Sequence, residues 1–393
     1  MRVALIAPLL ESVPPKLYGG TERVVHNLAL GLSGRGADVT VFASGDSNTA
    51  GELATVWPEA LRLRHGNLHN PTAYQIRMLE TVARRSGEFD LIHNHYDYPL
   101  LPLARMVSCP VLTTLHNSLD APDVGAAFEM YADLPYVSIS DSQRAPMPHL
   151  GWTATIQHGI DVNAFEARPV AGDYLAFLGR FSAEKGAHVA IEIARRAGIP
   201  LKLAAKVDEA YPEYYEREIK PKLDGRNVEY LGEITEKEKS EFLGGALALV
   251  NPIDWAEPFG LVMVEAMACG TPVLTRPVGS APEVVREGVT GFLRSDPLAL
   301  AKLVREAAAL DRMAIRREVE RKFSIERMTQ EYLDVYRRLV RGYASWKTAG
   351  RGPGWRRPPF RHKSTHPGGV ADHRRDLLHS VDGALDGDLQ GIS

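Results

Sequence analysis

The most specific pattern in this chain of 393 residues is DWAEPFGLVMVEAMACGTP, residues 254–272. An apolar run at 247–250 precedes it and predicts a buried strand, and the apolar run at 272–275 predicts the next strand. Pro258 suits the first position of a helix and Gly270 suits a helix end, so we expect a helix between the two strands. The pattern therefore predicts a strand–helix–strand unit with Glu257 at the mouth of its helix and Glu265 farther along.

The spacing of these two glutamates distinguishes two kinds of site. Eight residues separate them in the sequence, which corresponds to a rise of about 12 Å along a helix. The paired carboxylates of glycoside hydrolases lie about 5–9.5 Å apart. The pair is thus too widely spaced for a hydrolase dyad and suits the two ends of an extended ligand. An amphipathic helix with solvated acids is the alternative interpretation.

Short apolar segments alternate with helical patterns through most of the chain. Expected strands occupy residues 3–7, 39–43, 91–93, 111–115, 137–140, 155–157, 174–178, 201–205, 228–230, 247–250 and 272–275, and helices in the first half occupy 21–33, 72–85 and 124–132. This alternation is typical of α/β proteins with parallel sheets covered on both faces, although a single β/α barrel shares it. A polar break near 163–172 predicts domains at 1–165 and 166–324, followed by a helix at 325–344.

Composition argues against several classes of protein. The chain has 46 Lys plus Arg and 49 Asp plus Glu, a net charge of −3, whereas nucleic-acid binders usually carry a basic excess. Two cysteines are too few for a disulfide framework or a thiolate metal site. No apolar run approaches the ~20 residues of a membrane-spanning helix, and the N-terminus lacks a signal-peptide cleavage site. We expect a cytoplasmic protein without a transmembrane segment, with peripheral membrane contact left open.

Residues 345–393 differ in composition from the rest of the chain. They contain 8 Leu, Ile, Val and Phe among 49 residues, with 8 Gly and 4 Pro. A segment with so few apolar residues cannot offset the entropy lost on ordering. We expect a disordered tail.

The segment at 254–272 resembles the E-x7-E element of retaining glycosyltransferases of family 4, which adopt the GT-B fold. The resemblance covers about residues 1–343. It implies two Rossmann-like parallel-sheet domains facing each other across a cleft, with the acceptor on the side of the first and the nucleotide-sugar donor on the side of the second. It also implies that the helix at 325–344 crosses back to the first domain. Glu257 would face the donor sugar and Glu265 would bind the ribose hydroxyls.

Two further motifs match the family on the phosphate side of the donor. Residues 178–186 read LGRFSAEKG and match the pattern G-R-x4-K-G, which implies that Arg180 and Lys185 clamp the diphosphate. Lys185 is expected in the first turn of a helix, where the dipole disfavours a cation by about 0.3–1 kcal/mol and a bound anion would compensate. Gly19 and Gly20 resemble the family's N-terminal glycine loop, and glycines let a backbone approach a phosphate closely. The fingerprint G-x-G-x-x-G is absent here, which argues against an NAD enzyme.

The match implies other donor contacts. His116, at the end of an expected strand, would contact the sugar near the anomeric centre, and Ile234 lies in a loop that reads the nucleotide base. Lys206 would add a phosphate contact, with surface charge as the alternative. The free amides at the helix start would hold sugar hydroxyls or phosphate, and they belong to Phe259, Gly260 and Leu261.

Two histidine motifs need separate interpretation. His93, His95 and Asp97 have a spacing that suits a metal, but they also resemble an H-x-H strand end common in the family, where no metal is implied. His158 stands where family members often have asparagine, which leaves open whether it takes over the role of that asparagine. We expect no metal and no other cofactor.

The sequence as a whole predicts a retaining glycosyltransferase. It would move a hexosyl group from a nucleotide diphosphate sugar, with UDP-glucose as the default, to a hydroxyl of an unknown acceptor. The residues implied in catalysis are His116, Arg180, Lys185 and Glu257. The alternatives are a nucleotide-sugar epimerase of GT-B architecture, a glycosyl phosphorylase and a catalytically silent nucleotide-sugar-binding protein. The donor base and sugar, the acceptor and the oligomeric state stay open.

Overall fold

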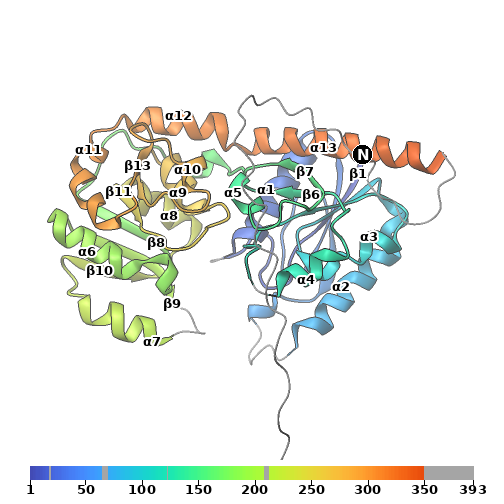
Figure 1. Ribbon diagram of the computed structural model, residues 1–393, viewed down its shortest axis with the longest axis horizontal. Coiled ribbons are helices and arrows are strands. Elements are labelled where there is room, and N and C mark those ends of the chain that lie inside the picture. Colours follow the sequence, from blue (N-terminus) through green and yellow to red (C-terminus); the bar gives the residue numbers. More distant parts are fainter. Residues whose placement is uncertain (17–18, 64–69, 122, 208–211, 349–393) are drawn as a thin grey trace, which may run out of the picture. The chain divides into compact units, whose positions relative to one another are not determined.

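The computed structural model describes residues 1–16, 19–63, 70–121, 123–207 and 212–348, which form two parallel sheets flanked by helices (Figure 1). The predicted tail at 345–393 lies outside the described residues from 349 onward. The α/β architecture with two separate sheets agrees with the prediction and excludes a single barrel.

The first sheet has seven parallel strands in the order β3-β2-β1-β4-β5-β6-β7. Its strands and helices are β1 (Arg2–Ile6), α1 (Gly20–Gly34), β2 (Asp38–Ser44), β3 (Glu52–Trp57), α2 (Pro71–Arg85), β4 (Leu91–Asn94), α3 (Leu103–Met106), β5 (Val111–Thr114), α4 (Val124–Glu129), β6 (Tyr136–Ser138), α5 (Asp141–Arg144) and β7 (Trp152–Thr155).

The second sheet has six parallel strands in the order β10-β9-β8-β11-β12-β13. Its elements are β8 (Tyr174–Phe181), α6 (Ala187–Ala197), β9 (Leu201–Val207), α7 (Pro212–Tyr214), β10 (Val228–Gly232), α8 (Glu236–Gly244), β11 (Ala246–Asn251), α9 (Leu261–Ala268), β12 (Val273–Thr275), α10 (Ala281–Val284) and β13 (Gly291–Leu293), followed by α11 (Val304–Ala308), α12 (Arg312–Lys322) and α13 (Ile325–Thr348).

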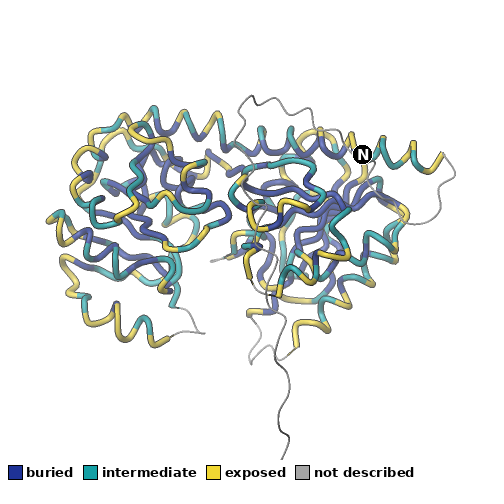
Figure 2. The backbone as a smooth tube through the Cα atoms, viewed as in Figure 1, coloured by how far each residue is buried: buried dark blue, intermediate teal, exposed yellow. Residues whose placement is uncertain are grey.

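Burial explains which strands the sequence predicts. In β1 every residue but Arg2 is buried, and in β2 every residue but Asp38, so both appear as unbroken apolar runs. Figure 2 shows this burial along the strands, while exposed residues follow the outer sides of the helices. β3 and β13, which were not predicted, are edge strands with partly exposed residues. An edge strand needs no continuous apolar run, since only part of it contacts the core.

The long helix α13 returns to the first sheet. It starts at Ile325, as expected, and continues to Thr348, beyond the expected end at 344. It packs against α1 so closely that a Cβ added at Gly31 would lie 2.0 Å from Thr329 Oγ1. Tyr332 and Tyr336 of α13 are fully buried in a core cluster with residues of β1 and β2. Side chains from the end of the described chain therefore reach the centre of the first sheet.

The strand order of each sheet predicts which loops would contact a ligand. Chain order reverses beside β1, which lies between β2 and β4, and beside β8, which lies between β9 and β11. In open α/β sheets, ligands bind at the carboxyl ends of the strands where this reversal occurs. The loops after β1, β4, β8 and β11 are therefore the segments in which a ligand site is expected.

A buried arginine on α12 donates hydrogen bonds to several loops at the edge of the second sheet. Arg312 is 4% exposed, and its guanidinium donates to the carbonyl oxygens of Arg168 (2.7 Å), Ala246 (3.0 Å) and Gly244 (2.9 Å) and to Thr271 Oγ1 (2.7 Å). Burial lowers the pKa of Arg312. Buried carbonyl oxygens normally have a hydrogen-bond donor, and here Arg312 supplies it. The role of Arg312 is therefore structural.

Substitution of Arg312 by methionine is expected to destabilise the second domain by about 3 kcal/mol, because several buried acceptors lose their donor at once. That corresponds to a fall in melting temperature of roughly 6–12 °C in differential scanning calorimetry. The matched control is Arg317→Met on the same helix, where the side chain is 64% exposed and pairs with Asp311 at 3.4 Å. Equal melting temperatures for the two variants would contradict this role of Arg312.

Candidate active site

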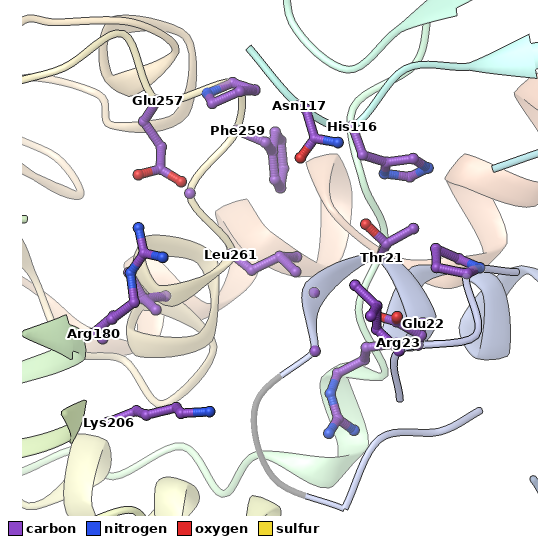
Figure 3. A pocket seen from close by; sticks show the side chains of 18 of the residues that line it. Thr21, Glu22, Arg23, His116, Asn117, Arg180, Lys206, Glu257, Phe259 and Leu261 are labelled. Carbon is purple, nitrogen blue, oxygen red and sulfur yellow. The ribbon is translucent and has the colours of Figure 1, made fainter. Parts of the chain in front are cut away.

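A cavity of about 650 Å³ is lined by the loops at the carboxyl ends of both sheets. Figure 3 shows side chains from both domains around it: Arg180 and Lys206 lie on β8 and β9, Glu257 in the loop after β11, Thr21 and Glu22 in α1, and His116 after β5. Every residue that the sequence singled out for donor binding or catalysis lines this cavity, namely Gly19, Gly20, His116, Arg180, Lys185, Lys206, Ile234, Glu257, Phe259, Gly260, Leu261 and Glu265.

Glu257 lies in the loop before α9 and not in the helix. The helix begins at Leu261, and its N-cap Gly260 has a left-handed backbone with φ 81°. Pro258 is therefore not the first helical residue, and the expected rise of 12 Å between the glutamates does not apply. The prediction was wrong because a turn in which the Glu257 amide donates to the Trp255 carbonyl (2.8 Å) bends the chain before the helix starts.

Lys185 forms an ion pair with Glu257 across the two loops that follow β8 and β11. Their side chains are 17% and 16% exposed, and the ammonium lies 4.9 Å from the centroid of the Trp255 ring. Lys185 ends a 3-10 turn (Ala183–Lys185), and the left-handed Gly186 separates it from α6. It is therefore not in the first turn of a helix as expected, and its charge is compensated by Glu257.

Two more cations border the same wall of the cavity. Arg180 and Lys206 are partners in the register of β8 and β9, so their side chains leave the sheet side by side. Figure 3 shows both on this wall. Arg180 also donates to Glu184 at 3.0 Å, and both of those side chains are more than a third exposed. Three cationic side chains thus lie on one wall of the cavity, two of them paired with glutamates, and could contact a polyanionic ligand.

Glu265 combines a paired and an unpaired oxygen. It lies within α9 and is 2% exposed. Its Oε1 accepts from Lys239 Nζ at 2.9 Å, and its Oε2 is buried without a hydrogen-bond partner in the described part of the chain. Buried carboxylate oxygens are normally satisfied. The Oε2 atom of this cavity-lining residue is therefore available to accept a hydrogen bond.

The sequence motifs did not single out several lining residues, among them Trp255, Lys239 and Glu22. Trp255 packs on Lys185, Lys239 holds Glu265, and Glu22 is a 5% exposed carboxyl in the first turn of α1. Burial and the nearby charge of Glu11 raise the pKa of Glu22 to about 7. Glu22 directly follows the glycine loop, which was a usable signal. Lys239 stands in a highly charged helix, so nothing in the sequence separated it from solvated lysines.

The histidines of the first sheet bind one another. His95 Nδ1 lies 2.9 Å from His116 Nε2, and the ring of His158 stacks on that of His116 with centroids 5.2 Å apart. Asp97, the third member of the H-x-H-x-D pattern, accepts instead from Asn117 Nδ2 at 2.8 Å. Within the described ranges, no group of three or more His, Cys, Asp or Glu side chains is arranged to hold a metal ion.

Among the described helices, none combines the length and the apolar character that crossing a membrane requires.

Comparison with known proteins identifies the family. Residues 163–321 match the family model of glycosyl transferases group 1, and residues 18–150 match that of glycosyltransferase family 4. The phosphatidyl-myo-inositol mannosyltransferase of Mycobacterium leprae is 25% identical over 335 residues, which cover 77% of this chain and 86% of the relative. The glycogen synthase of Mycobacterium tuberculosis is 27% identical over 330 residues, covering 71% and 79%.

Solved structures agree with this assignment. AviGT4, a glycosyltransferase involved in avilamycin A biosynthesis, superposes with a TM-score of 0.66 at 26% identity, covering 87% of this chain and 98% of AviGT4. Anabaena HepE in complex with UDP-glucose has the same fold, with a TM-score of 0.67 at 19% identity, covering 86% and 100%. Both domains, their sheet order and the cavity between them fit this architecture. The chain is therefore a glycosyltransferase of family 4, group 1, with the GT-B fold.

Proposed function

We propose that this enzyme transfers a hexosyl group from a nucleotide diphosphate sugar to an acceptor hydroxyl with retention of the anomeric configuration. The observation that carries the proposal is the set of charged groups that line the second-domain wall of the cavity. An unpaired, buried Oε2 of Glu265 suits a ribose hydroxyl, and the cations Arg180, Lys185 and Lys206 suit a diphosphate. Glu257, held by Lys185, then faces the sugar.

Charge explains how these side chains would act. Departure of the diphosphate concentrates negative charge on its leaving oxygen, and preorganised cations stabilise such charge in the transition state. Glu257 pairs with Lys185 and holds it beside the proposed diphosphate site, so the ammonium needs little reorientation when the diphosphate binds. Glu257 in turn lies where positive charge develops on the sugar ring. The acceptor would enter from the first domain, past Glu22 and Asn117.

UDP-glucose is the proposed donor. Two solved structures of the same fold are described as complexes of HepE with UDP and with UDP-glucose. The mannosyltransferases among the relatives make GDP-mannose the first competitor to test. Cationic side chains supply the charge at the proposed diphosphate site, so we propose that transfer needs no divalent cation.

The proposal predicts slow transfer to water when no acceptor is present. The full chain with UDP-glucose and EDTA is expected to release UDP and α-glucose, detected by proton NMR before the anomers equilibrate. UDP at 100 times its Kd is expected to stabilise the fold by about 2.7 kcal/mol in a thermal-shift assay, and GDP to stabilise it less. Stabilisation by GDP and not by UDP would contradict UDP-glucose as the donor but would leave the proposed transfer reaction in place.

Each rival activity has its own signature in this experiment. First-formed β-glucose would contradict retention, and activity that requires added Mg²⁺ or Mn²⁺ would contradict the metal-free proposal. An epimerase would release UDP with a changed sugar, a phosphorylase would release sugar phosphate only with added phosphate, and a silent binding protein would show the thermal shift without donor consumption.

A further inference from the structure

A chain of hydrogen-bonded side chains connects α13 to His116 at the cavity. Tyr336 Oη lies 2.6 Å from His93 Nδ1, His95 Nε2 lies 3.2 Å from the same Nδ1, and His95 Nδ1 lies 2.9 Å from His116 Nε2. On the other side of His93, Nε2 lies 2.7 Å from Thr114 Oγ1, which lies 3.0 Å from Tyr332 Oη. All of these groups except His116 are fully or almost fully buried.

Burial keeps the members of this chain uncharged. It lowers the pKa of His116 to about 3 and the pKa values of His93 and His95 well below their usual range. It also raises the pKa of Tyr336 well above its usual range. Near neutral pH each imidazole therefore carries one proton, and each ring has one donor nitrogen and one acceptor nitrogen. The question is which nitrogen holds the proton.

Tyr336 determines which nitrogen of His93 holds the proton. A phenol is a stronger acid than a neutral imidazole, and an imidazole nitrogen is a stronger base than a phenol oxygen. The 2.6 Å contact is therefore a hydrogen bond in which Tyr336 Oη donates and His93 Nδ1 accepts. The proton of His93 then sits on Nε2 and is donated to Thr114 Oγ1, which shares a second hydrogen bond with Tyr332 Oη. Both ring nitrogens of His93 therefore have hydrogen-bond partners.

The position of the proton on His93 also sets the positions of the ring protons on His95 and His116. The single lone pair of His93 Nδ1, which accepts from Tyr336, also faces His95 Nε2 at 3.2 Å, with the two rings tilted by 45° and their centroids 3.9 Å apart. A bare Nε2 would set two lone pairs against each other at this contact, so Nε2 holds the proton of the His95 ring. His95 Nδ1 is then an acceptor, and His116 Nε2 donates to it. His116 Nδ1 is left with a lone pair, and no described residue makes a hydrogen bond to it. His158 stacks on the His116 ring at 19° between planes, which fixes the plane of the ring.

We infer that Tyr336 and His95 are positioning residues that hold His116 as the Nε2–H tautomer and thereby present its Nδ1 to the cavity as a hydrogen-bond acceptor. Such a nitrogen binds a hydroxyl group of the ligand and cannot donate to a phosphate oxygen. That the hydroxyl belongs to the donor sugar rests on the proposed function, whereas the tautomer does not. The end of the described chain thus controls the chemistry of a side chain more than 200 residues away in sequence.

The tautomer can be measured on the full chain without any ligand. Long-range proton–nitrogen NMR correlations on protein labelled with nitrogen-15 in its 13 histidines distinguish a protonated from a bare ring nitrogen. The His116 signals are assigned by their loss in His116→Asn. We expect a protonated Nε2 and a bare Nδ1 at pH 7. A protonated Nδ1 in the parent protein would overturn the inference. A parent protein that shows the expected tautomer but has no transferase activity would instead contradict the proposed function.

Two tyrosines on the same helix give matched variants. Tyr336→Phe removes the donor to His93 Nδ1, so the His116 signals are expected to show a mixture of tautomers, and kcat to fall about 3- to 10-fold with unchanged affinity for UDP. Tyr332→Phe removes an equally buried hydroxyl that bonds Thr114 and not a ring nitrogen of His93, so the tautomer is expected to stay as in the parent. Identical spectra for the two variants would contradict the role of Tyr336.

His95 offers a test by rescue. His95→Phe removes the hydrogen bonds to both His93 and His116, so this variant is expected to show mixed tautomers of His116 and the same fall in kcat. Glutamine carries both an acceptor oxygen and donor hydrogens on its amide, so His95→Gln is expected to recover the Nε2–H tautomer and most of the activity. A glutamine variant no better than the phenylalanine variant would show that His95 only fills space.

Discussion

Glutamine in place of Glu257 is expected to lower kcat about 10²–10³-fold, the usual cost of losing one preorganised electrostatic group at a reacting centre. Glu257 contacts Lys185 and lies beside the proposed sugar position, where charge changes on reaching the transition state. Interactions that strengthen only in the transition state appear in kcat. The affinity for free UDP, measured by calorimetric titration, is therefore expected to stay within about twofold of the parent.

A matched control exists in the same domain. Glu287 pairs with Arg294 at 2.7 Å on the surface, where its side chain is 50% exposed, and it does not line the cavity. Glu287→Gln makes the same change in charge and size and should leave kcat unchanged. If Glu257→Gln abolished UDP binding and kept kcat at saturating donor, the assignment of Glu257 to the sugar end would be wrong.

Glutamine in place of Glu265 is expected to act on binding instead. The ribose keeps the same contacts in the ground state and the transition state, so loss of the carboxylate should raise the donor KM with little change in kcat. Hydrogen bonds to a charged group contribute about 1.5–3 kcal/mol, so the Kd for UDP should rise about 10- to 100-fold. The same calorimetric titration measures it.

Stability needs its own control in this variant. Glu265 is 2% exposed, and without its charge Lys239 keeps Glu236, at 3.5 Å, as its one ion-pair partner among the described residues. Because breaking a buried ion pair costs about 3–5 kcal/mol, the single variant should melt at a lower temperature. The double variant Glu265→Gln with Lys239→Met should recover much of that loss and still bind UDP weakly. Parent-like UDP affinity in either variant would rule out Glu265 as the ribose ligand.

Much of the fold could be predicted because buried parallel strands leave unbroken apolar runs. The segments at 3–7, 39–43 and 247–250 coincide with strands that are buried along nearly their whole length. The edge strands β3 and β13 were missed since half-exposed strands lack such runs. Helix ends were predicted less well where a left-handed glycine intervenes, as Gly260 delays the start of α9 and Gly186 keeps Lys185 out of α6.

Motifs in the sequence identified twelve residues that line the cavity, because motifs at the ends of parallel strands converge where the strand order reverses, but they left out Trp255, Lys239 and Glu22. Which side chains bind each other was decided only by the tertiary structure. Lys185 meets Glu257, and Lys239 meets Glu265, through contacts between loops and helices that sequence spacing does not encode. His93 and His95 meet Tyr336 because α13 returns across the first sheet. Such partners depend on how separate elements pack, and packing is a property of the whole fold and not of any one segment.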